Sequence, residues 1–229
     1  MLNLYERNGL IFWNEKQIKI REMLKEFFVN NVRETLRDLN KAFDMIQVEA
    51  PLLTPVEFIN PQYSASDMYI ANGHFQSTAG FDLVLRPETT MGSYRYAKHL
   101  LETHSKIKLP VVIWQHGKSF RREQDQVTKN MRLKEFYQLE FQCIYGLTTA
   151  NDYSATVVPA VHNIISRMLG DCRIEDSDRL PNYAEWTKDI VVEKNNMEVC
   201  SISQRKDFPN AKVLEIAIGT DRCVYNFDE

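Results

Sequence analysis

The chain has 229 residues, of which 44% are hydrophobic and 26% are charged, and its formal net charge is −3. This composition is typical of a soluble chain that can bury a core. The slightly acidic balance disfavours a protein that coats nucleic acid non-specifically, although it permits a local basic patch. No apolar run approaches the roughly 18 residues of a membrane helix, and the N-terminus lacks the pattern of a signal peptide.

The four cysteines lie far apart and include no C-x-x-C pair, and the five histidines show no metal-ligand spacing. This pattern predicts reduced thiols in a cytosolic protein and disfavours a zinc site or a disulfide framework. We therefore expect a cytoplasmic protein that has no membrane partner.

The N-terminal part predicts a long helix. Asn14 and Gln17 have the spacing of a capping box. Apolar residues then recur at steps of three and four residues from 20 to 43, which is typical of an amphipathic helix. A strand over 45–49 follows, and Pro51 closes it.

The central part alternates irregular and regular segments. Residues 60–82 are predicted to be irregular, and a short strand over 83–85 and a helix over 92–103 follow. A further strand begins at residue 111. The runs 114–121 and 133–145 flank a polar segment and predict a long antiparallel hairpin.

The C-terminal part begins with a predicted helix over 152–169, which Pro159 interrupts early. Strands over 190–193, 197–203 and 212–218 follow, and a short helical piece comes after Gly219. The predicted class is α+β, a mostly antiparallel sheet flanked by helices, in a single domain that spans residues 1–229.

The chain contains neither of the common glycine-rich phosphate loops, since its eight glycines never cluster. A bound nucleotide would therefore have to be held by arginine side chains. Four segments place arginine near a carboxylate, and each also has a simpler structural explanation.

Two of these segments belong to the predicted hairpin. In Phe120-Arg121-Arg122-Glu123, Arg121 and Glu123 share one strand face, where a guanidinium suits a phosphate; a cross-strand salt bridge is the alternative. The second segment, 132–136, continues into polar residues at every second position, 138, 140 and 142. This period predicts a polar functional face, or a face that is simply exposed to solvent.

The other two segments lie at strand ends. In 215–222 a strand enters a helix through Gly219, and Arg222 in the first turn opposes the helix dipole. Its position favours contact with an anion, with a frayed surface arginine as the alternative. Arg86-Pro87-Glu88-Thr89 carries a charge on each side of a proline, and helix capping is its structural explanation.

Taken in order, these segments resemble the catalytic core of class II aminoacyl-tRNA synthetases, and most closely the dimeric type of glycyl-tRNA synthetase. Segments 30–55, 111–144 and 211–228 resemble motifs 1, 2 and 3 of that class, and Arg86-Pro87-Glu88-Thr89 with Gly92 resembles R-P-E-T-x-x-G. The resemblance implies the class II fold and, through motif 1, a homodimer. It also implies ATP-dependent activation of an amino acid to an aminoacyl-adenylate.

The resemblance implies an ATP site built from motifs 2 and 3. Arg121 would hold the α-phosphate, and Glu123 would read the adenine amine. Phe136 would stack on one face of the adenine, with Arg222 on the other face or at the γ-phosphate. Arg132 would also reach the phosphates. Arg121 and Arg222 are thus the expected catalytic residues.

The resemblance also implies a site for the amino acid and for magnesium. Glu215 would help to bind Mg²⁺ between phosphates. Glu88 would pair with the α-ammonium of the amino acid, with Glu140 nearby. Arg86 and Arg205 would lie at the amino acid site.

Departures from the family pattern concern amino acid recognition. Where the family has E-P-S, this chain has Ile216 and Ala217 after the glutamate, and Gln142 replaces a second glutamate. The expected substrate is therefore glycine or another small amino acid. The sequence stops shortly after motif 3, so we expect a core without an anticodon-binding domain.

Two classes of function stay open at the sequence level. The first is a ligase that passes the amino acid to a tRNA end or to another acceptor. The second is a synthetase-derived binding or accessory module that has lost catalysis. The retained Arg121, Glu123, Glu215 and Arg222 favour the enzyme.

Overall fold

The computed structural model describes residues 5–7, 9–40, 43–59, 63–71, 83–103, 107–122, 131–147, 153–208 and 210–227. Glu123 and the polar segment 124–130 lie outside the described residues. The largest sheet consists of β3 (Asp44–Gln47), β6 (Val111–Phe120), β7 (Glu135–Tyr145), β8 (Cys172–Asp176), β9 (Ala184–Val192), β10 (Met197–Arg205) and β11 (Lys212–Gly219).

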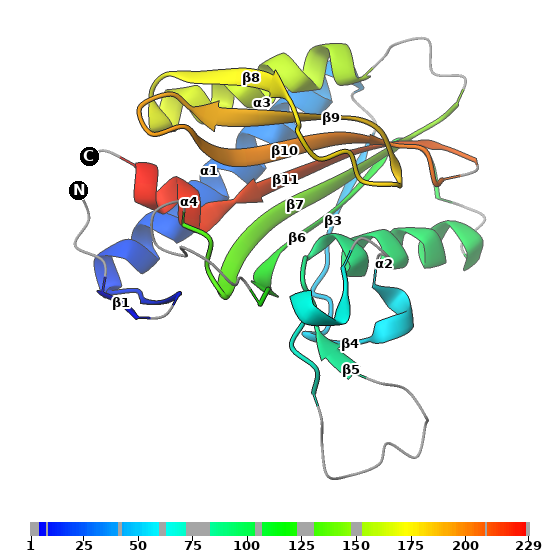
Figure 1. Ribbon diagram of the computed structural model, residues 1–229. Coiled ribbons are helices and arrows are strands. Elements are labelled where there is room, and N and C mark those ends of the chain that lie inside the picture. Colours follow the sequence, from blue (N-terminus) through cyan, green and yellow to red (C-terminus); the bar gives the residue numbers. More distant parts are fainter. Residues whose placement is uncertain are drawn as a thin grey trace.

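These seven strands lie in the order β3-β6-β7-β11-β10-β9-β8 (Figure 1). Only β3 and β6 pair in parallel within this sheet, and the other neighbours are antiparallel. β6 and β7 form the long hairpin that the sequence predicts. The α+β class, a mostly antiparallel sheet flanked by helices, is confirmed.

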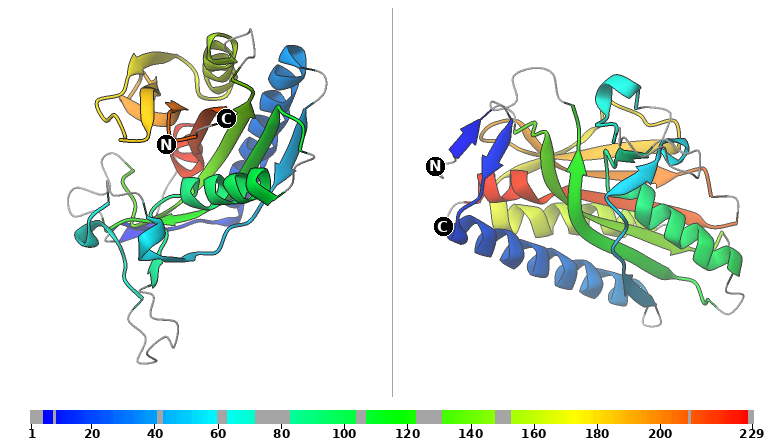
Figure 2. Two further views of the ribbon diagram at one scale, coloured as in Figure 1. Left: turned by 90° about the vertical axis from the view of Figure 1, so that its right-hand side faces the viewer. Right: turned by 90° about the horizontal axis from the view of Figure 1, so that it is seen from below.

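Helices cover both faces of this sheet, and they are α1 (Glu15–Leu39), α2 (Thr90–Thr103), α3 (Tyr153–Leu169) and α4 (Thr220–Asn226). α1 and α3 pack together over one face, whereas α2 lies against β6 and β7 on the other (Figure 2). α4 lies at the end of β11 and packs against α1. None of the helices in the described part is long and apolar enough to span a membrane.

The alternation of side chains along β7 explains how the sheet serves both a core and a site. Leu139, Phe141 and Cys143 point to the face covered by α1 and α3 and belong to the main hydrophobic core. Glu140 and Gln142 point to the opposite face, yet both are completely buried. The alternative of a face that is simply exposed to solvent is therefore wrong at these two positions, because the fold covers them.

α1 begins as the sequence predicts and ends earlier. The Asn14 side chain accepts the backbone N–H of Gln17 at 3.0 Å, and the Gln17 side chain accepts the N–H of Asn14 at 2.9 Å. The predicted extension to Phe43 is wrong, because Asn40 has extended backbone (φ −152°, ψ 115°) and ends the helix at Leu39.

α3 runs through Pro159 without a break, so the predicted interruption is wrong. Proline removes a single N–H donor. Val157, Val161 and Ile165 around it are at most 1% exposed and hold the helix against the core.

Two glycines allow α2 and β6 to approach their neighbours closely. A Cβ atom on Gly92 would collide with the Cβ of Ala50, and one on Gly117 would collide with the guanidinium of Arg86. Gly117 therefore makes room for Arg86 at the edge of the site, and Gly92 lets α2 approach the segment that contains Ala50.

The predicted strand 83–85 is confirmed as β5 (Leu83–Leu85), which pairs with β4 (Leu53–Pro55). Besides β4 and β8, the elements that were not predicted are β1 (Tyr5–Arg7), β2 (Leu10–Phe12) and the 3-10 helices η1 (Val56–Phe58) and η2 (Ala65–Asp67).

Candidate active site

A cavity of about 980 Å³ opens on the sheet face opposite α1 and α3. Its floor comes from strand residues that the antiparallel register brings side by side. Glu215 on β11 pairs with Ser203 on β10, which pairs with Thr187 on β9. In the next row, Ala217 pairs with Ser201. Every second residue of these strands therefore faces the cavity.

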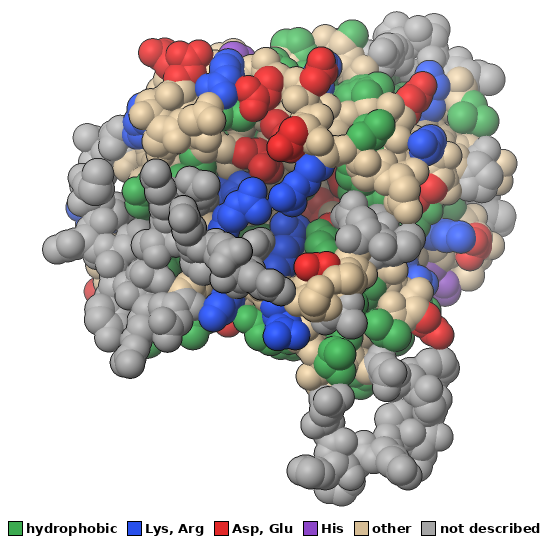
Figure 3. Space-filling view, in the orientation of Figure 1, with side chains coloured by type: hydrophobic (Ala, Val, Ile, Leu, Met, Phe, Trp, Pro, Cys, Tyr) green, Lys and Arg blue, Asp and Glu red, His purple; other side chains and the backbone are tan. Residues whose placement is uncertain are grey.

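Six of the predicted site residues line this cavity. They are Glu88, Arg121, Arg132, Phe136, Glu215 and Arg222. Arg122 and Arg179 line it as well. Figure 3 shows Lys and Arg side chains gathered near the centre of this face, with Asp and Glu side chains above them. The cavity thus offers a basic region suited to a phosphate chain.

Arg121 lies just beyond the end of β6, at the edge of the cavity. Its Nε donates to the carbonyl oxygen of Pro87 at 3.0 Å, and its Nη2 lies 4.0 Å from a carboxylate oxygen of Glu88. The guanidinium carbon lies 5.2 Å from the ring centroid of Phe136 and 5.4 Å from that of Tyr63. These contacts orient Arg121 toward the cavity.

Arg222 lies in the first turn of α4. Its Nη1 donates to the backbone carbonyl of Glu198 at 2.8 Å and lies 3.6 Å from the Glu198 carboxylate. The alternative of a frayed surface arginine does not fit, because the side chain lines the cavity and has these partners.

Glu88 presents a carboxylate at the other side of the cavity. The hydroxyl of Tyr63 donates to its Oε2 at 2.7 Å, whereas its Oε1 has no hydrogen-bond partner among the described residues. Burial raises the pKa of Glu88, and the nearby charge of Arg121 opposes that shift. A buried carboxylate oxygen without a partner suits a cationic ligand such as an ammonium group.

Glu215 is held by three donors. Nη1 of Arg205 lies at 2.6 Å and Nε2 of Gln142 at 2.8 Å from Oε2, and the hydroxyl of Tyr183 lies at 3.1 Å from Oε1. Three donors among the described residues leave room on the carboxylate for one more partner, and Glu215 lines the cavity, so its chemistry fits a single protein ligand of a phosphate-bound Mg²⁺. Within the described part of the chain, no three His, Cys, Asp or Glu side chains are grouped as a site built from protein ligands alone would require.

Arg205 lies beneath the cavity wall and does not line it. Its guanidinium carbon lies 4.1 Å from the ring centroid of Tyr94 and 4.0 Å from that of Tyr183, and the guanidinium donates twice to Asp207. Burial acts to lower the pKa of Arg205, but the carboxylates of Glu215 and Asp207 raise it above its usual value. Arg205 therefore holds Glu215 in place.

Arg86 and Glu140 also lie outside the cavity lining. Arg86 donates to the backbone carbonyls of Lys118 and Ala50, at 2.8 and 2.7 Å, and so ties the motif to β6. Glu140 accepts from Ser93 at 2.7 Å and from Gln142 at 2.6 Å. Burial and the charge of Glu215 raise the pKa of Glu140 to about 7.

Several cavity residues were not singled out from the sequence. Ser201 and Ser203 carry a signal that could have found them, because they alternate on a strand in register with Thr187. Tyr63 carries no such signal, since it reaches Glu88 across 25 residues of chain. It is positioned by tertiary structure alone.

Residues 10–175 match the family model described as "tRNA synthetases class II core domain (F)". The chain belongs to this family of class II synthetase cores. Among curated relatives, it is 25% identical over 189 residues to a glycine–tRNA ligase of Mycoplasmopsis synoviae (strain 53), a match that covers 77% of this chain and 40% of the relative.

A second relative is the glycine–tRNA ligase of Mycoplasma capricolum subsp. capricolum (strain California kid), 31% identical over 134 residues. This match covers 54% of the chain and 29% of the relative. The matched part thus spans well under half the length of either ligase.

Solved structures with the same fold include two prolyl-tRNA synthetases. The enzyme from Cryptosporidium parvum, complexed with halofuginone and AMPPNP, superposes with a TM-score of 0.76 at 13% identity. The enzyme from Giardia lamblia, in complex with prolyl-adenylate, gives 0.71 at 18% identity. Each match covers 97% of this chain and 48% of the other, and shows a shared fold.

Proposed function

We propose that this chain activates an amino acid with ATP to form an aminoacyl-adenylate. The observation that carries the proposal is the convergence of Arg121, Phe136, Arg222 and Glu88 on one cavity of a class II synthetase fold. Arginines suited to phosphates, and a Glu88 carboxylate oxygen that has no partner in the described part of the chain and suits an ammonium, match the two substrates of this reaction. The matches to two glycine–tRNA ligases support the same reaction class.

In the proposed reaction, a carboxylate oxygen of the amino acid attacks the α-phosphorus of ATP. The new O–P bond forms as the bond from the α-phosphorus to the bridging oxygen breaks, and pyrophosphate leaves with its electron pair. No general base is needed, because the carboxylate is already ionised at pH 7. Catalysis consists of alignment and of charge neutralisation at the α-phosphate, for which we assign Arg121.

The nucleotide is assigned to the side of the cavity that motifs 2 and 3 form. Phe136 offers a ring for stacking, and Arg222 offers a cation on the adjacent wall. Arg132 extends the basic lining toward the phosphates. Class II synthetases in general use ATP with Mg²⁺; Glu215 on the cavity wall would help to hold the ion, which would neutralise charge on the phosphates.

The amino acid is assigned to the pocket floor near Glu88 and Glu215. Ile216 is completely buried in the core, so its departure from the family pattern does not reach the cavity. Ala217 does line the cavity, and a hydroxyl is therefore missing there. The neighbouring Ser201 supplies one instead, which keeps a small amino acid, glycine or another, as the proposed substrate.

An assay of ATP–pyrophosphate exchange with each of the twenty amino acids tests the proposal. Exchange with one or a few small amino acids is expected. Absence of exchange with all twenty would favour the alternative of a catalytically inactive binding module.

We further propose a cytoplasmic homodimer that transfers the amino acid to a tRNA end, with a different acceptor as the alternative. Charging of a tRNA pool with the labelled amino acid distinguishes tRNA from a different acceptor. Label in acid-precipitable RNA is expected, and its absence would assign the acceptor to another molecule.

A further inference from the structure

The first turn of α4 is joined to β7 at the wall of the cavity, which Tyr137 and Asp221 also line. The backbone N–H of Tyr137 donates to Oδ2 of Asp221 at 2.8 Å. The backbone carbonyl of the same residue accepts from the hydroxyl of Thr220 at 3.1 Å. Two consecutive α4 residues thus hold both polar backbone groups of one β7 residue. Thr220 and Asp221 are 0% and 2% exposed.

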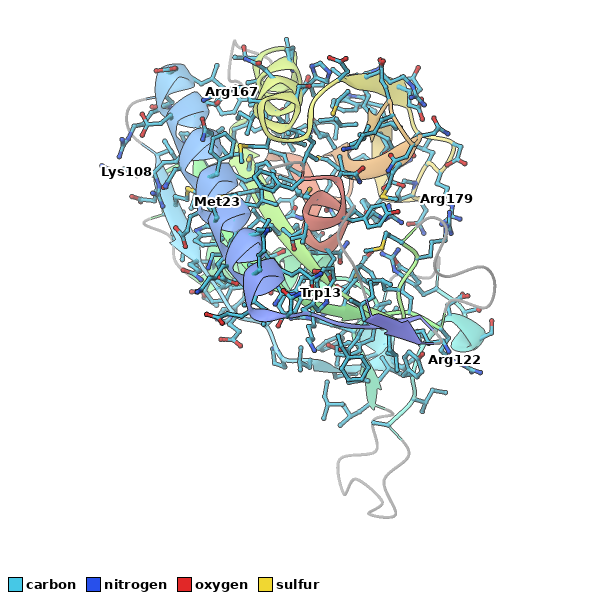
Figure 4. The ribbon with its side chains drawn as sticks, turned by 90° about the vertical axis from the view of Figure 1, so that its left-hand side faces the viewer. Trp13, Met23, Lys108, Arg122, Arg167 and Arg179 are labelled. Atoms are coloured by element: carbon cyan, nitrogen blue, oxygen red, sulfur yellow. The ribbon has the colours of Figure 1, made fainter. Side chains whose placement is uncertain are left out.

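A cation from α1 completes this junction. Nη1 of Arg21 lies 3.3 Å from Oδ1 of Asp221, so the two carboxylate oxygens have different partners. The guanidinium of Arg21 lies 3.9 Å from the ring centroid of Tyr137 and 5.7 Å from that of Trp13. Figure 4 looks onto α1 and α4 and labels Trp13 at the N-terminal end of α1.

Because both side chains are buried, removal of one partner of this ion pair should be costly. Arg21 is 6% exposed and Asp221 2% exposed, so loss of either partner leaves an uncompensated buried charge. Burial raises the pKa of Asp221 to about 6, although the N–H of Tyr137 and the charge of Arg21 act in the opposite direction. Binding is therefore measured at pH 7.5, above this pKa, where the ionised form of Asp221 and its pair with Arg21 are favoured.

The junction is flanked in sequence by the two residues that we assign to the nucleotide, Phe136 on β7 and Arg222 on α4. Phe136 directly precedes Tyr137, and Arg222 directly follows Asp221; both line the cavity. We propose that Asp221, held by Arg21, is a positioning residue that sets the spacing between Phe136 and Arg222 and so the affinity for ATP. This inference rests on the proposed function only in taking ATP as the ligand.

The test measures ATP binding by isothermal titration calorimetry without amino acid. Arg21→Met removes the cation and keeps most of the side-chain volume, and Asp221→Ala removes the acceptor. Arg21→Lys keeps the charge, and Lys25→Met removes a cation one turn further along α1 that pairs with Glu22 and Glu26. Circular dichroism and thermal unfolding identify the variants that fold.

Arg21→Met and Asp221→Ala should each weaken ATP binding about tenfold, since small misplacements in such sites are costly. Arg21→Lys should recover most of the affinity, and Lys25→Met should bind as the wild type does. In exchange assays the KM for ATP should rise in the first two variants while the KM for the amino acid stays unchanged. The double variant should be no worse than the single ones, because both act through one pair.

Folded Arg21→Met protein with wild-type ATP affinity would overturn the inference, as would wild-type protein that binds no ATP. If Arg21→Met does not fold, Arg21→Lys decides: affinity near that of the wild type supports the pair, and a loss equal to that of Asp221→Ala contradicts it. A wild type that binds ATP but exchanges with no amino acid would end the proposed function and leave this inference standing.

Discussion

Arg121 lines the cavity together with other arginines, among them Arg122 and Arg132. Its Nε is held by the carbonyl of Pro87, and its guanidinium lies beside Phe136. A side chain held in this way is pre-organised to neutralise charge that develops on a phosphate. The same Nη2 lies near Glu88, which joins the phosphate region to the region assigned to the ammonium.

The first prediction concerns this residue. Arg121→Ala should lower kcat/KM for ATP–pyrophosphate exchange by at least about 100-fold, roughly 3 kcal/mol of transition-state stabilisation. Lys98→Ala, an exposed lysine on α2, serves as the control and should retain the wild-type rate. An Arg121→Ala rate within a few-fold of the control would contradict the role assigned to Arg121.

The second prediction concerns Glu140, whose pKa is raised to about 7 by burial. In the unfolded chain this carboxyl titrates near pH 4.3, so the folded state binds more protons between these two values. Its contribution to the free energy of unfolding therefore decreases as pH rises from about 4.5 to 7.

Glu140→Gln removes this titration while retaining an acceptor for Ser93 and Gln142. The variant should lose less stability than the wild type over that pH range, and at pH 8 it should be at least as stable. Thermal unfolding at several pH values measures this. Identical pH dependence in both proteins would contradict the raised pKa.

At the residue scale, the sequence located the charged lining of the cavity. Arg121, Arg132 and Arg222 were found because arginine on or beside a strand, next to carboxylates and without a glycine loop, is unusual. Which of the predicted residues line the cavity, and which support it from beneath, could not be predicted from the sequence. Arg205 and Arg86 satisfy carboxylates and carbonyls beneath the surface, and this difference depends on register and burial.

At the element scale, β6 and α2 depend on close packing around the segment from Arg86 to Thr89. The third prediction tests this with Gly117→Ala. The added Cβ would collide with the guanidinium of Arg86, which is bonded to Lys118 and Ala50 and cannot move freely. The free energy of unfolding should fall by about 1–3 kcal/mol, as for overpacked sites.

Urea unfolding measures this loss. The matched comparison is Gly117→Ala in an Arg86→Ala background, where the obstructing guanidinium is absent. The glycine substitution should then cost much less. An equal cost in both backgrounds would assign the effect to the strand itself and would contradict the collision.

The elements themselves were largely predictable, and the errors have physical reasons. The capping box of α1 and the alternation of β7 are local signals, and the structure confirms both. The end of α1 was misplaced, because Phe43 continues the apolar period although the chain turns at Asn40. β8 escaped prediction because Cys172–Asp176 is a short, mostly exposed edge strand with little hydrophobic pattern.

At the scale of the whole molecule, the fourth prediction is the homodimer. We expect an interface of roughly 2,000 Å² or more that involves α1 and the segment near Pro51. Leu52 and Leu53 in that segment are 45% and 47% exposed, so an interface there would bury apolar side chains.

Light scattering at micromolar concentration should give twice the mass of one chain. Leu53→Asp should shift the protein toward the monomer without changing its circular dichroism. A wild-type monomer at that concentration would remove the dimer from this account.

We expect one cavity, on the sheet face opposite α1 and α3, to hold ATP between β7 and α4. A crystal structure of the wild-type chain with ATP decides this. Adenine should lie between Phe136 and Arg222, and the α-phosphate should lie within hydrogen-bond distance of Arg121. Nucleotide bound at another place on the molecule, with these three side chains untouched, would contradict it.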